Sequence, residues 1–241
     1  ASFNFKWNIL RYRSRNVNKI VKELSNIKYW LFDLDNTLYS GATKVFDQVD
    51  KKMSKFISEK LKVSLEEAKK IQKNYFHEYN TTLNGMIKNH DIDANEFLEF
   101  VHDVNLEFLK RDEPLKKEIT RLKGKKIIFT NGSKAHAANV TSRIGIEQLF
   151  DGVFDIVDSD FYPKPSIEPY KKIIENYKIE PEYCIFFEDI ARNLKPAYEL
   201  GMKTVWIENN EPWAAKHSDE KFVNYKTESL TKFIKEINEN R

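Results

Sequence analysis

Short apolar runs alternate with amphipathic stretches along most of the chain. The largely apolar runs are "YWLFDL" (29–34), "KIIFT" (126–130), "VFDIV" (153–157), "CIFFE" (184–188) and "TVWI" (204–207). Runs of this length, separated by helical patterns, are typical of parallel strands covered on both faces. Ser133 and Gly145 bracket one of the intervening helices as N-cap and C-terminal cap. The pattern therefore predicts an α/β fold with a doubly wound parallel sheet.

One connection departs from this spacing. Between Asp35 and Lys125 the chain has helical periodicity and no convincing strand. Ser64 and Glu67 form a capping box at the start of one of these helices. The segment is too long for a loop, so it predicts a small helical domain mounted over the end of the first strand. The predicted division is a basic N-terminal arm at 1–27, a Rossmann-like core at 28–40 and 118–241, and a helical cap at 41–117.

Composition is that of a folded globular protein, because 41% of the 241 residues are hydrophobic and 13% are aromatic. The 40 basic residues nearly balance the 37 acidic ones, so the net charge of +3 does not by itself indicate a nucleic acid or membrane partner. The single cysteine, Cys184, lies in an apolar run, which we interpret as a core position in a reducing compartment. No apolar stretch approaches the roughly 18 residues that span a bilayer, and the beginning lacks the pattern of a secretory signal. We expect a soluble, cytoplasmic protein.

Basic residues are concentrated at the beginning of the sequence. Residues 1–28 contain a single acidic residue, Glu23, and seven basic ones: Lys6, Arg11, Arg13, Arg15, Lys19, Lys22 and Lys28. This segment is either a solvated helical arm or a contact for an anion or a nucleic acid. Because no interleaving of aromatic and basic residues continues into the domain, we favour the first interpretation and expect no nucleic-acid partner.

Reactive side chains follow the predicted strands where each strand ends. They are Asp33 and Asp35, then Thr130 and Asn131, then Lys164 in the loop beyond the third strand, then Glu188 and Asp189. The carboxyl ends of parallel strands meet at one edge of a sheet, where ligands bind. Carboxylates brought together there need a cation. Mg²⁺ takes one or two carboxylates, waters and substrate phosphate oxygens, and Asp33 and Asp189 suit the protein's share.

A phosphoryl group bound beside such a metal needs further hydrogen-bond donors. Thr130, the backbone amides of Asn131 and Gly132 at a helix N-terminus, and Lys164 would provide them. The sequence has neither a Walker A loop nor a G-x-G-x-x-G fingerprint, so a nucleotide would be a substrate and not an energy source or redox cofactor. These residues predict hydrolysis or transfer of a phosphoester by a carboxylate nucleophile.

Four motifs resemble those of the haloacid dehalogenase superfamily in order and spacing. They are "FDLDNT" (32–37), "FTNGS" (129–133), "PKP" (163–165) and "FFEDIARNLKPAYELGM" (186–202). The helical insert after the first motif resembles the C1 cap of that superfamily. Residues 28–210 are similar to the bacterial pyrimidine 5′-nucleotidase group, and the similarity includes the insert segments "KNYFHEYNTTLNGM" and "FLEFVHDV".

The resemblance implies roles for the strand-end residues. Asp33 would attack phosphorus and form an aspartyl-phosphate. Asp35 would protonate the leaving oxygen and then activate water, while its backbone carbonyl binds Mg²⁺. Thr130 and Lys164 would hold phosphoryl oxygens, and Asp189 would complete the metal site. Glu188 departs from the Asp-Asp form common in the superfamily, although Glu-Asp also occurs there, and it would bind the metal either directly or through water.

The insert would select the substrate, since the strand-end residues can recognise only phosphate and metal. The stretch from residue 75 to 86 is expected to reach a nucleoside, with Thr81 and Thr82 as polar candidates. Three histidines of the insert, His77, His90 and His102, lie on ordinary amphipathic helices, and we expect surface or core roles for them rather than metal binding.

The leading hypothesis is a Mg²⁺-dependent phosphomonoesterase that acts on a small molecule, UMP or CMP. Another phosphatase or a phosphosugar mutase of the same superfamily is the nearest alternative. A dehalogenase is disfavoured, because a halide leaves without a proton whereas the chain keeps Asp35. A binding or regulatory module that uses the basic arm is an alternative of a different class, and the intact catalytic set argues against it. The sequence does not indicate an oligomeric state.

Overall fold

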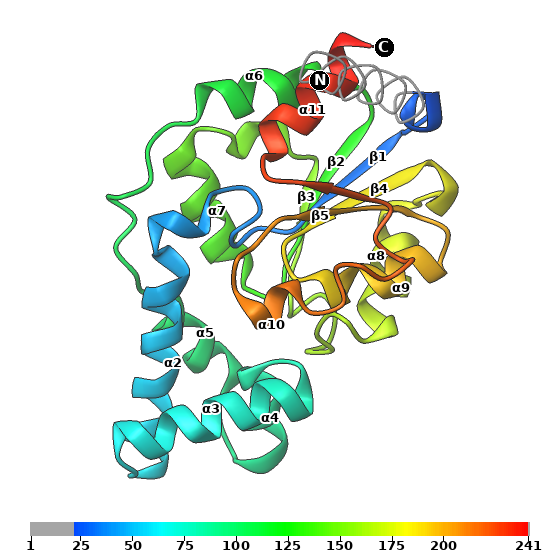
Figure 1. The fold of residues 1–241 in the computed structure, drawn as a ribbon. Coiled ribbons are helices and arrows are strands. Elements are labelled where there is room, and N and C mark those ends of the chain that lie inside the picture. The colour runs from blue at the N-terminus through cyan, green and yellow to red at the C-terminus, as the bar shows by residue number, and fades with distance from the viewer. Residues whose placement is uncertain (1–21, 241) are drawn as a thin grey trace, which may run out of the picture.

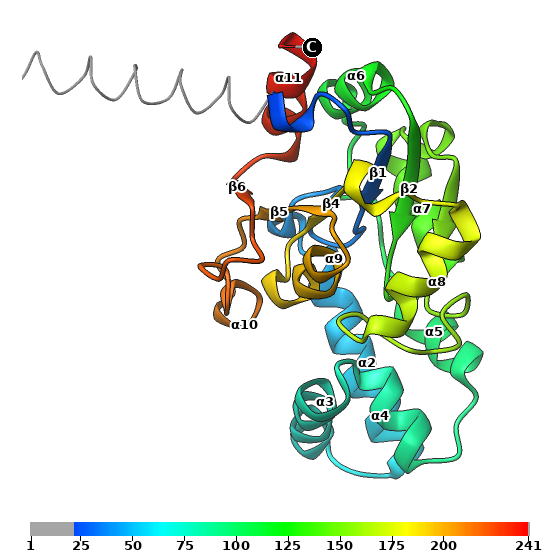
Figure 2. The same ribbon diagram turned by 90° about the vertical axis from the view of Figure 1, so that its right-hand side faces the viewer.

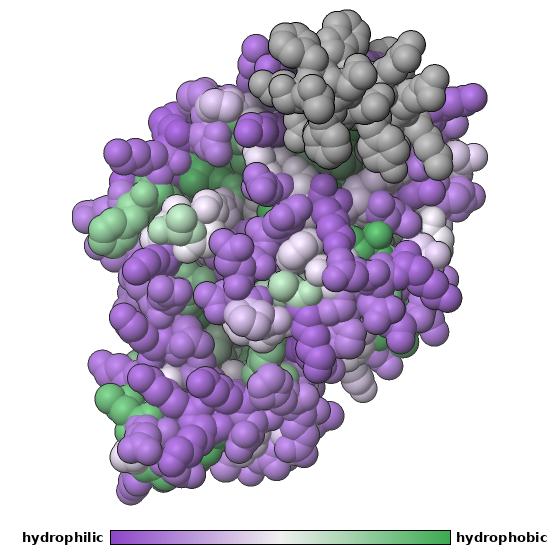
Figure 3. Space-filling model, in the orientation of Figure 1, coloured by the Kyte–Doolittle hydropathy of each residue, from purple (hydrophilic) through white to green (hydrophobic). Residues whose placement is uncertain are grey.

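The computed structural model describes residues 22–240, which form a parallel sheet with helices on both faces and a helical bundle at one end (Figures 1 and 2). The predicted doubly wound α/β fold is confirmed. Most of the predicted basic arm lies outside the described residues, and its role stays a prediction. Figure 3 shows hydrophilic residues over most of the face seen in Figure 1. Across residues 22–240, none of the helices combines the length and hydrophobicity that a bilayer-spanning segment requires.

The sheet has six strands in the order β3-β2-β1-β4-β5-β6, and all neighbouring strands are parallel. The two central strands, β1 and β4, pair directly. The carboxylates of the site, which follow these two strands, are therefore brought close together. The strands are β1 (Tyr29–Phe32), β2 (Lys125–Phe129), β3 (Gly152–Phe154), β4 (Cys184–Glu188), β5 (Lys203–Ile207) and β6 (Tyr225–Thr227).

Each face of the sheet has its own core. Trp30 and Phe32 of β1 pack on one face, and Leu31 between them packs on the other, as the alternation of side chains along a strand requires. The first face is covered by α6 (Glu113–Arg121), α7 (Lys134–Ile144) and α11 (Leu230–Glu239), and the second by α8 (Ile167–Tyr177) and α9 (Leu194–Glu199), with the short α10 (Pro212–Ala215) beside them.

The predicted helical insert consists of four helices between β1 and α6. They are α2 (Val45–Leu61), α3 (Leu65–Tyr79), α4 (Thr82–Asn89) and α5 (Ala94–His102). Ser64 caps α3 by accepting a hydrogen bond from the amide of Glu67, as the capping-box pattern indicates. The four helices enclose a third core, in which Phe56 and Phe97 pack edge to face with ring centroids 5.0 Å apart.

The division into core and cap at residue 117 stays a prediction. Helix α6 runs across that position, and its buried residues Leu115 and Ile119 both belong to the core on the sheet. A boundary before α6 therefore agrees better with the packing than one inside it.

Candidate active site

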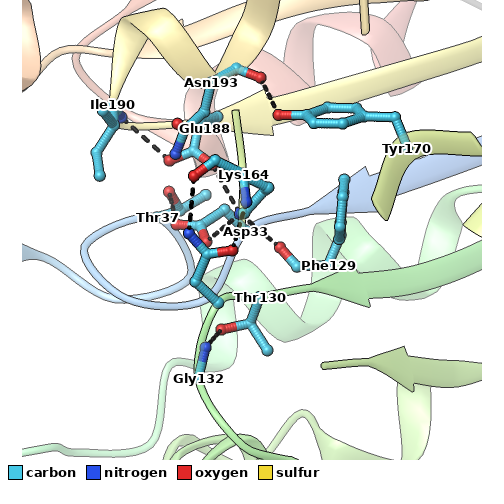
Figure 4. Close-up of polar contacts among 11 residues, drawn as sticks. Asp33, Thr37, Phe129, Thr130, Gly132, Lys164, Tyr170, Glu188, Ile190 and Asn193 are labelled. Atoms are coloured by element: carbon cyan, nitrogen blue, oxygen red, sulfur yellow. Dashed lines mark hydrogen bonds and ion pairs between the residues drawn. The ribbon is translucent and has the colours of Figure 1, made fainter. Parts of the chain in front are cut away.

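Asp33 lies directly after β1, and both oxygens of its carboxylate are held by hydrogen bonds. Its backbone amide donates to the carbonyl of Phe187 on β4, so the strand pairing continues to this residue. Thr37 Oγ1 donates to Asp33 Oδ2 at 3.0 Å, and Lys164 Nζ donates to Asp33 Oδ1 at 2.9 Å (Figure 4). The side chain is buried, and the sequence motif around β1 is thus folded into the centre of the site.

Lys164 lies between the carboxylates, as Figure 4 shows, and is only 1% exposed. Its ammonium group donates to Asp33 Oδ1 at 2.9 Å, to Glu188 Oε2 at 2.8 Å and to the carbonyl of Phe129 at 2.8 Å. Burial opposes the charge on Lys164, but the two carboxylates outweigh it and raise the pKa to about 12. All three ammonium protons are engaged with the protein, so Lys164 first of all balances negative charge in the site.

The carboxylates of Asp33, Glu188 and Asp189 offer oxygens that lie within 4.8 Å of one another. Burial and the neighbouring charge of Glu188 raise the pKa of Asp33 to about 7, and the same two causes raise the pKa of Asp189 well above its usual value. Lys164 supplies a single positive charge to this group. The cluster is therefore short of positive charge and has the oxygen ligands that suit a divalent cation.

Two residues fix the orientation of Asp189. Its carboxylate oxygen Oδ2 accepts a hydrogen bond from Asn209 Nδ2 at 2.7 Å, and its carbonyl accepts one from the indole of Trp206 at 2.7 Å. Glu188 is engaged through both oxygens, because Oε2 accepts from Lys164 and Oε1 accepts from the amide of Ile190 at 3.1 Å. Asp189 is therefore more available than Glu188 to bind a metal ion.

Asp35 is held through one oxygen only. Oδ1 accepts hydrogen bonds from the hydroxyl of Tyr39 at 2.5 Å and from His136 Nε2 at 2.8 Å. Within residues 22–240, Oδ2 accepts none. Burial opposes ionisation of Asp35, but His136 and then Tyr39 outweigh it and lower the pKa to about 2.

The loop after β2 contributes a hydroxyl that can still donate. The amide of Gly132 donates to Thr130 Oγ1 at 2.9 Å, which leaves the hydroxyl proton of Thr130 available for another acceptor. The side chain of Asn131 is bound to the backbone of Lys164, since Nδ2 donates to the carbonyl of Lys164 at 3.2 Å and Oδ1 accepts from its amide at 2.8 Å. The amide of Gly132 and the side chain of Asn131 thus organise the loop.

A cavity of about 430 Å³ joins these residues to the helical insert. Asp33, Asp35, Thr130, Lys164 and Asp189 line it from the sheet. The insert contributes a mainly apolar wall that includes Phe46, Val49, Met53, Phe76 and Leu83. The strand-end residues predicted from the sequence are therefore brought to one cavity.

Thr81 and Thr82 also line the cavity, but their hydroxyls have partners in the insert. Thr81 Oγ1 caps α4 by accepting from the amide of Asn84 at 3.1 Å. Thr82 is 4% exposed, and its hydroxyl donates to the carbonyl of Gln72 at 3.5 Å.

The cavity adds contacts and residues that the sequence-based prediction does not name, although Phe76 lies within the predicted stretch from 75 to 86. Phe76 of the insert meets Trp213 of α10 edge to face at 5.4 Å, and the guanidinium of Arg192 lies 4.8 Å from the centre of the Phe76 ring. Asn193 is buried beside the acidic cluster, and its Oδ1 has no hydrogen-bond partner among the described residues. Such an acceptor suits a water or a cation. The sequence signal for Asn193 is its place four residues after Asp189, on the turn that follows β4.

A parallel sheet with buried carboxylates at the ends of two adjacent central strands, under a helical insert, defines a hydrolase of the haloacid dehalogenase type. The family of haloacid dehalogenase-like hydrolases matches residues 27–201, and the chain belongs to this family. The resemblance of its motifs to this superfamily is thereby confirmed. The narrower similarity to pyrimidine 5′-nucleotidases stays a prediction.

Two relatives of the chain have names that refer to phosphate. Phosphate metabolism protein 8 of Saccharomyces cerevisiae is 31% identical over 195 residues, which are 73% of this chain and 60% of the yeast protein. The chain thus spans about three fifths of that relative. Glyceraldehyde 3-phosphate phosphatase of Methanocaldococcus jannaschii is 26% identical over 224 residues, which are 86% of this chain and 96% of the archaeal protein.

A solved structure of similar fold is the HAD phosphatase from Thermococcus onnurineus. It aligns with a TM-score of 0.58 at 20% sequence identity. The alignment covers 87% of this chain and 97% of the Thermococcus chain. At this level of identity, the likeness concerns the fold alone.

Proposed function

We propose that the protein is a Mg²⁺-dependent phosphomonoesterase in which Asp33 is the nucleophile. The observation that carries this proposal is the convergence of Asp33, Asp35, Thr130, Lys164 and Asp189 on one cavity from four separate segments of the chain. The pKa of Asp33, raised to about 7, indicates a carboxylate that needs a cation beside it to be fully ionised. When bound, Mg²⁺ would supply that charge and stabilise the negative charge of the phosphoryl group.

The chemistry has two steps. A carboxylate oxygen of Asp33 forms a bond to phosphorus while the bond to the leaving oxygen breaks, which gives an aspartyl-phosphate. Asp35 gives its proton to the leaving oxygen. In the second step, Asp35 takes a proton from a water whose oxygen attacks phosphorus, so that phosphate leaves and the carboxylate of Asp33 is regenerated.

Asp35 is ionised in the free site, because its pKa is lowered to about 2. A phosphoryl anion bound beside Asp35 favours its protonated form, so Asp35 takes up a proton from the entering substrate or from water and then donates it to the leaving oxygen. Thr130 is proposed to donate to a phosphoryl oxygen, together with the loop amides of Asn131 and Gly132, the latter in exchange for its present bond to Thr130 Oγ1. Lys164 is proposed to bind phosphate as well, by exchanging one of its present partners for a phosphoryl oxygen.

Asp33, Asp189 and the backbone carbonyl of Asp35 are the proposed protein ligands of Mg²⁺. We propose that Glu188, which binds Lys164 through Oε2 and the amide of Ile190 through Oε1, holds Lys164 in place and acts on the metal through water.

Pyrimidine nucleoside 5′-monophosphates are the proposed substrates, and the helices α2–α5 are the proposed C1 cap. The motifs of the insert support this choice, and so does the apolar cavity wall with Phe76 and Trp213, which suits a planar base. Thr81 and Thr82 remain candidates for contact with the nucleoside through their cavity-lining atoms. The name of the archaeal relative favours a second candidate, a phosphatase for a small sugar phosphate.

A panel of phosphomonoesters tests both candidates. We expect UMP and CMP to be hydrolysed with the highest kcat/KM, ahead of AMP, glyceraldehyde 3-phosphate and p-nitrophenyl phosphate, and only with Mg²⁺. Asp33→Asn should reduce turnover to background, whereas Asp91→Asn, at an exposed position in the insert, should not. A preference for glyceraldehyde 3-phosphate would select the second candidate. Turnover by Asp33→Asn above about a few per cent of wild type would rule out the covalent mechanism, because loss of the nucleophile should leave only background activity.

A further inference from the structure

His102 is the last residue of α5, and the insert brings it into contact with the core. Its ring stacks on that of His136 from α7, with centroids 4.2 Å apart and an angle of 8° between the planes. His136 in turn binds Asp35. His102 lines the same cavity as the strand-end residues.

The contacts of Ser133 are compatible with a His102 ring that carries its proton on Nε2. Ser133 Oγ accepts from the backbone amide of His136 at 3.2 Å, as the N-cap of α7. Its own proton has one acceptor within residues 22–240, which is His102 Nδ1 at 3.1 Å. Burial, and then His136, lower the pKa of His102 to about 3, so the ring is neutral and has a single proton. In the tautomer in which Nδ1 accepts the proton of Ser133, the proton of the ring lies on Nε2.

The Nε2 atom of His102 borders a space left by a glycine. A Cβ atom added to Gly132 would lie 3.4 Å from His102 Nε2 and 3.3 Å from Thr130 Oγ1. The N–H of His102 and the free hydroxyl proton of Thr130 therefore flank the same small volume at the edge of the cavity, beside the loop that follows β2. Two donors that lie near the same point beside Gly132 suit an anionic oxygen as their common acceptor.

We propose that His102 Nε2–H donates a hydrogen bond to a phosphoryl oxygen of the substrate, so that the insert supplies one of the donors of the phosphate site. This inference rests on the proposed phosphomonoesterase function. It assigns the insert a part in binding the reacting group itself, in addition to selecting the organic part of the substrate. The core alone would lack this donor.

Binding of inorganic phosphate in the presence of Mg²⁺, measured by calorimetry on the full chain, tests the inference. His102→Phe keeps a ring that can stack on His136 and removes both nitrogens, whereas His102→Gln places an amide N–H near the position of Nε2. A hydrogen bond to a charged group corresponds to roughly a tenfold to hundredfold change in affinity. We expect His102→Phe to weaken phosphate binding by about that factor, and His102→Gln to recover most of it.

Two further variants control for folding. His217→Phe makes the same substitution at an exposed histidine that does not line the cavity, and it should leave phosphate affinity unchanged. Gly132→Ala leaves His102 intact but fills the space between the two donors, and it should also weaken phosphate binding. Thermal unfolding of each variant identifies those that are folded.

The outcomes separate this inference from the proposed function. If wild type binds phosphate and both His102→Phe and Gly132→Ala bind it equally well, His102 is not a donor, and the phosphomonoesterase proposal is untouched. If wild type binds no phosphate with Mg²⁺ and hydrolyses no phosphoester, the proposed function fails and this inference fails with it. Weakened binding in His102→Phe, with recovery in His102→Gln, supports the donor even if the preferred substrate is not a nucleotide.

Discussion

His136 Nε2 donates to Asp35 Oδ1 at 2.8 Å, and this contact selects the oxygen that is available for proton transfer. The hydroxyl of Tyr39 occupies the same oxygen. Oδ2 is left as the atom that can carry a proton to the leaving group and later take one from water. His136 is therefore a positioning residue for the proposed acid.

Removing His136 should affect substrates according to their leaving groups. A nucleoside leaves as a poorly stabilised alkoxide and needs a proton, whereas p-nitrophenolate leaves almost unaided. General acid catalysis contributes about 10²- to 10⁴-fold, and we expect His136→Leu to lose about tenfold or more of this with UMP. Rapid-quench measurement of aspartyl-phosphate formation should show a much smaller loss with p-nitrophenyl phosphate.

Asp35→Asn is the reference for this comparison, because it removes the transferred proton itself. It should also slow UMP more than p-nitrophenyl phosphate, and the difference should be larger than in His136→Leu. His136→Gln retains an N–H and should recover part of the rate with UMP. Equal slowing with both substrates in His136→Leu and Asp35→Asn would mean that these residues mainly shape the metal site.

The effect of Mg²⁺ on stability should depend on pH. The pKa of Asp33 is raised in the folded state to about 7, so ionisation opposes folding and the stability of the metal-free protein falls as pH rises from about 4 to about 7. Asp189 shifts in the same direction. Mg²⁺ bound to the ionised carboxylates would offset this loss. We expect Mg²⁺ to raise Tm by roughly 5 °C more at pH 8 than at pH 5.5 in differential scanning calorimetry.

Asp33→Asn supplies the control for the pH effect. It cannot ionise, so its metal-free form should lose less stability between pH 5.5 and pH 8 than wild type. The raised pKa of His136 also makes stability fall as pH rises, and it is present in both proteins. A Mg²⁺-induced rise in Tm that is the same at both pH values would contradict the assignment of the acidic cluster as the metal site.

The contact between Phe76 and Trp213 should determine how well a base is recognised. Stacking of a base on an aromatic ring contributes about 1–3 kcal/mol, so Phe76→Leu should reduce kcat/KM for UMP by about tenfold. The inhibition constant of inorganic phosphate should stay the same, because phosphate does not reach this wall. Phe108→Leu replaces an aromatic residue that is 63% exposed and should change neither value. If substitutions at Phe76 and Trp213 both leave the ranking of substrates intact, the base binds elsewhere.

Phe97 should be important for the stability of the insert. It is 1% exposed and packs against Phe56, so Phe97→Ala should cost about 3–5 kcal/mol in the free energy of unfolding, measured with urea. Phe108→Ala, at the exposed site, should cost less than about 1 kcal/mol. Since Phe97 belongs to the core of the insert and Asp189 does not, Mg²⁺ should still stabilise the folded Phe97→Ala protein. Loss of that stabilisation would show that the substitution disrupts the metal site in the folded protein.

The sequence predicts the strand-end residues well because their convergence follows from topology. Parallel strands with similar apolar runs bring Asp33, Thr130 and Asp189 to the same edge whatever the details of packing. β6 has no such signal, since it is short and none of its residues is fully buried. Its place in the sheet depends on pairing with β5.

The rest of the cavity depends on contacts that local patterns do not contain. His136 and Asp35 are 101 positions apart in the chain, and a histidine in the first turn of a helix has no distinctive spacing. The meeting of Phe76 with Trp213 depends on how the insert is placed against the core. Thr81 illustrates the opposite difficulty, because the same hydroxyl can cap a helix or face a substrate, and composition does not distinguish the two.

The paired hydrogen bonds between the side chain of Asn131 and the backbone of Lys164 have a consequence for the timing of catalysis. They tie the exit of β2 to a loop 33 positions later in the chain, so Thr130 and Lys164 belong to one stiff unit. A substrate that enters does not have to assemble this half of its binding site. Only the side chains and the insert still have to rearrange when the substrate binds. The charges and dipoles of this half of the site are already oriented in the folded protein.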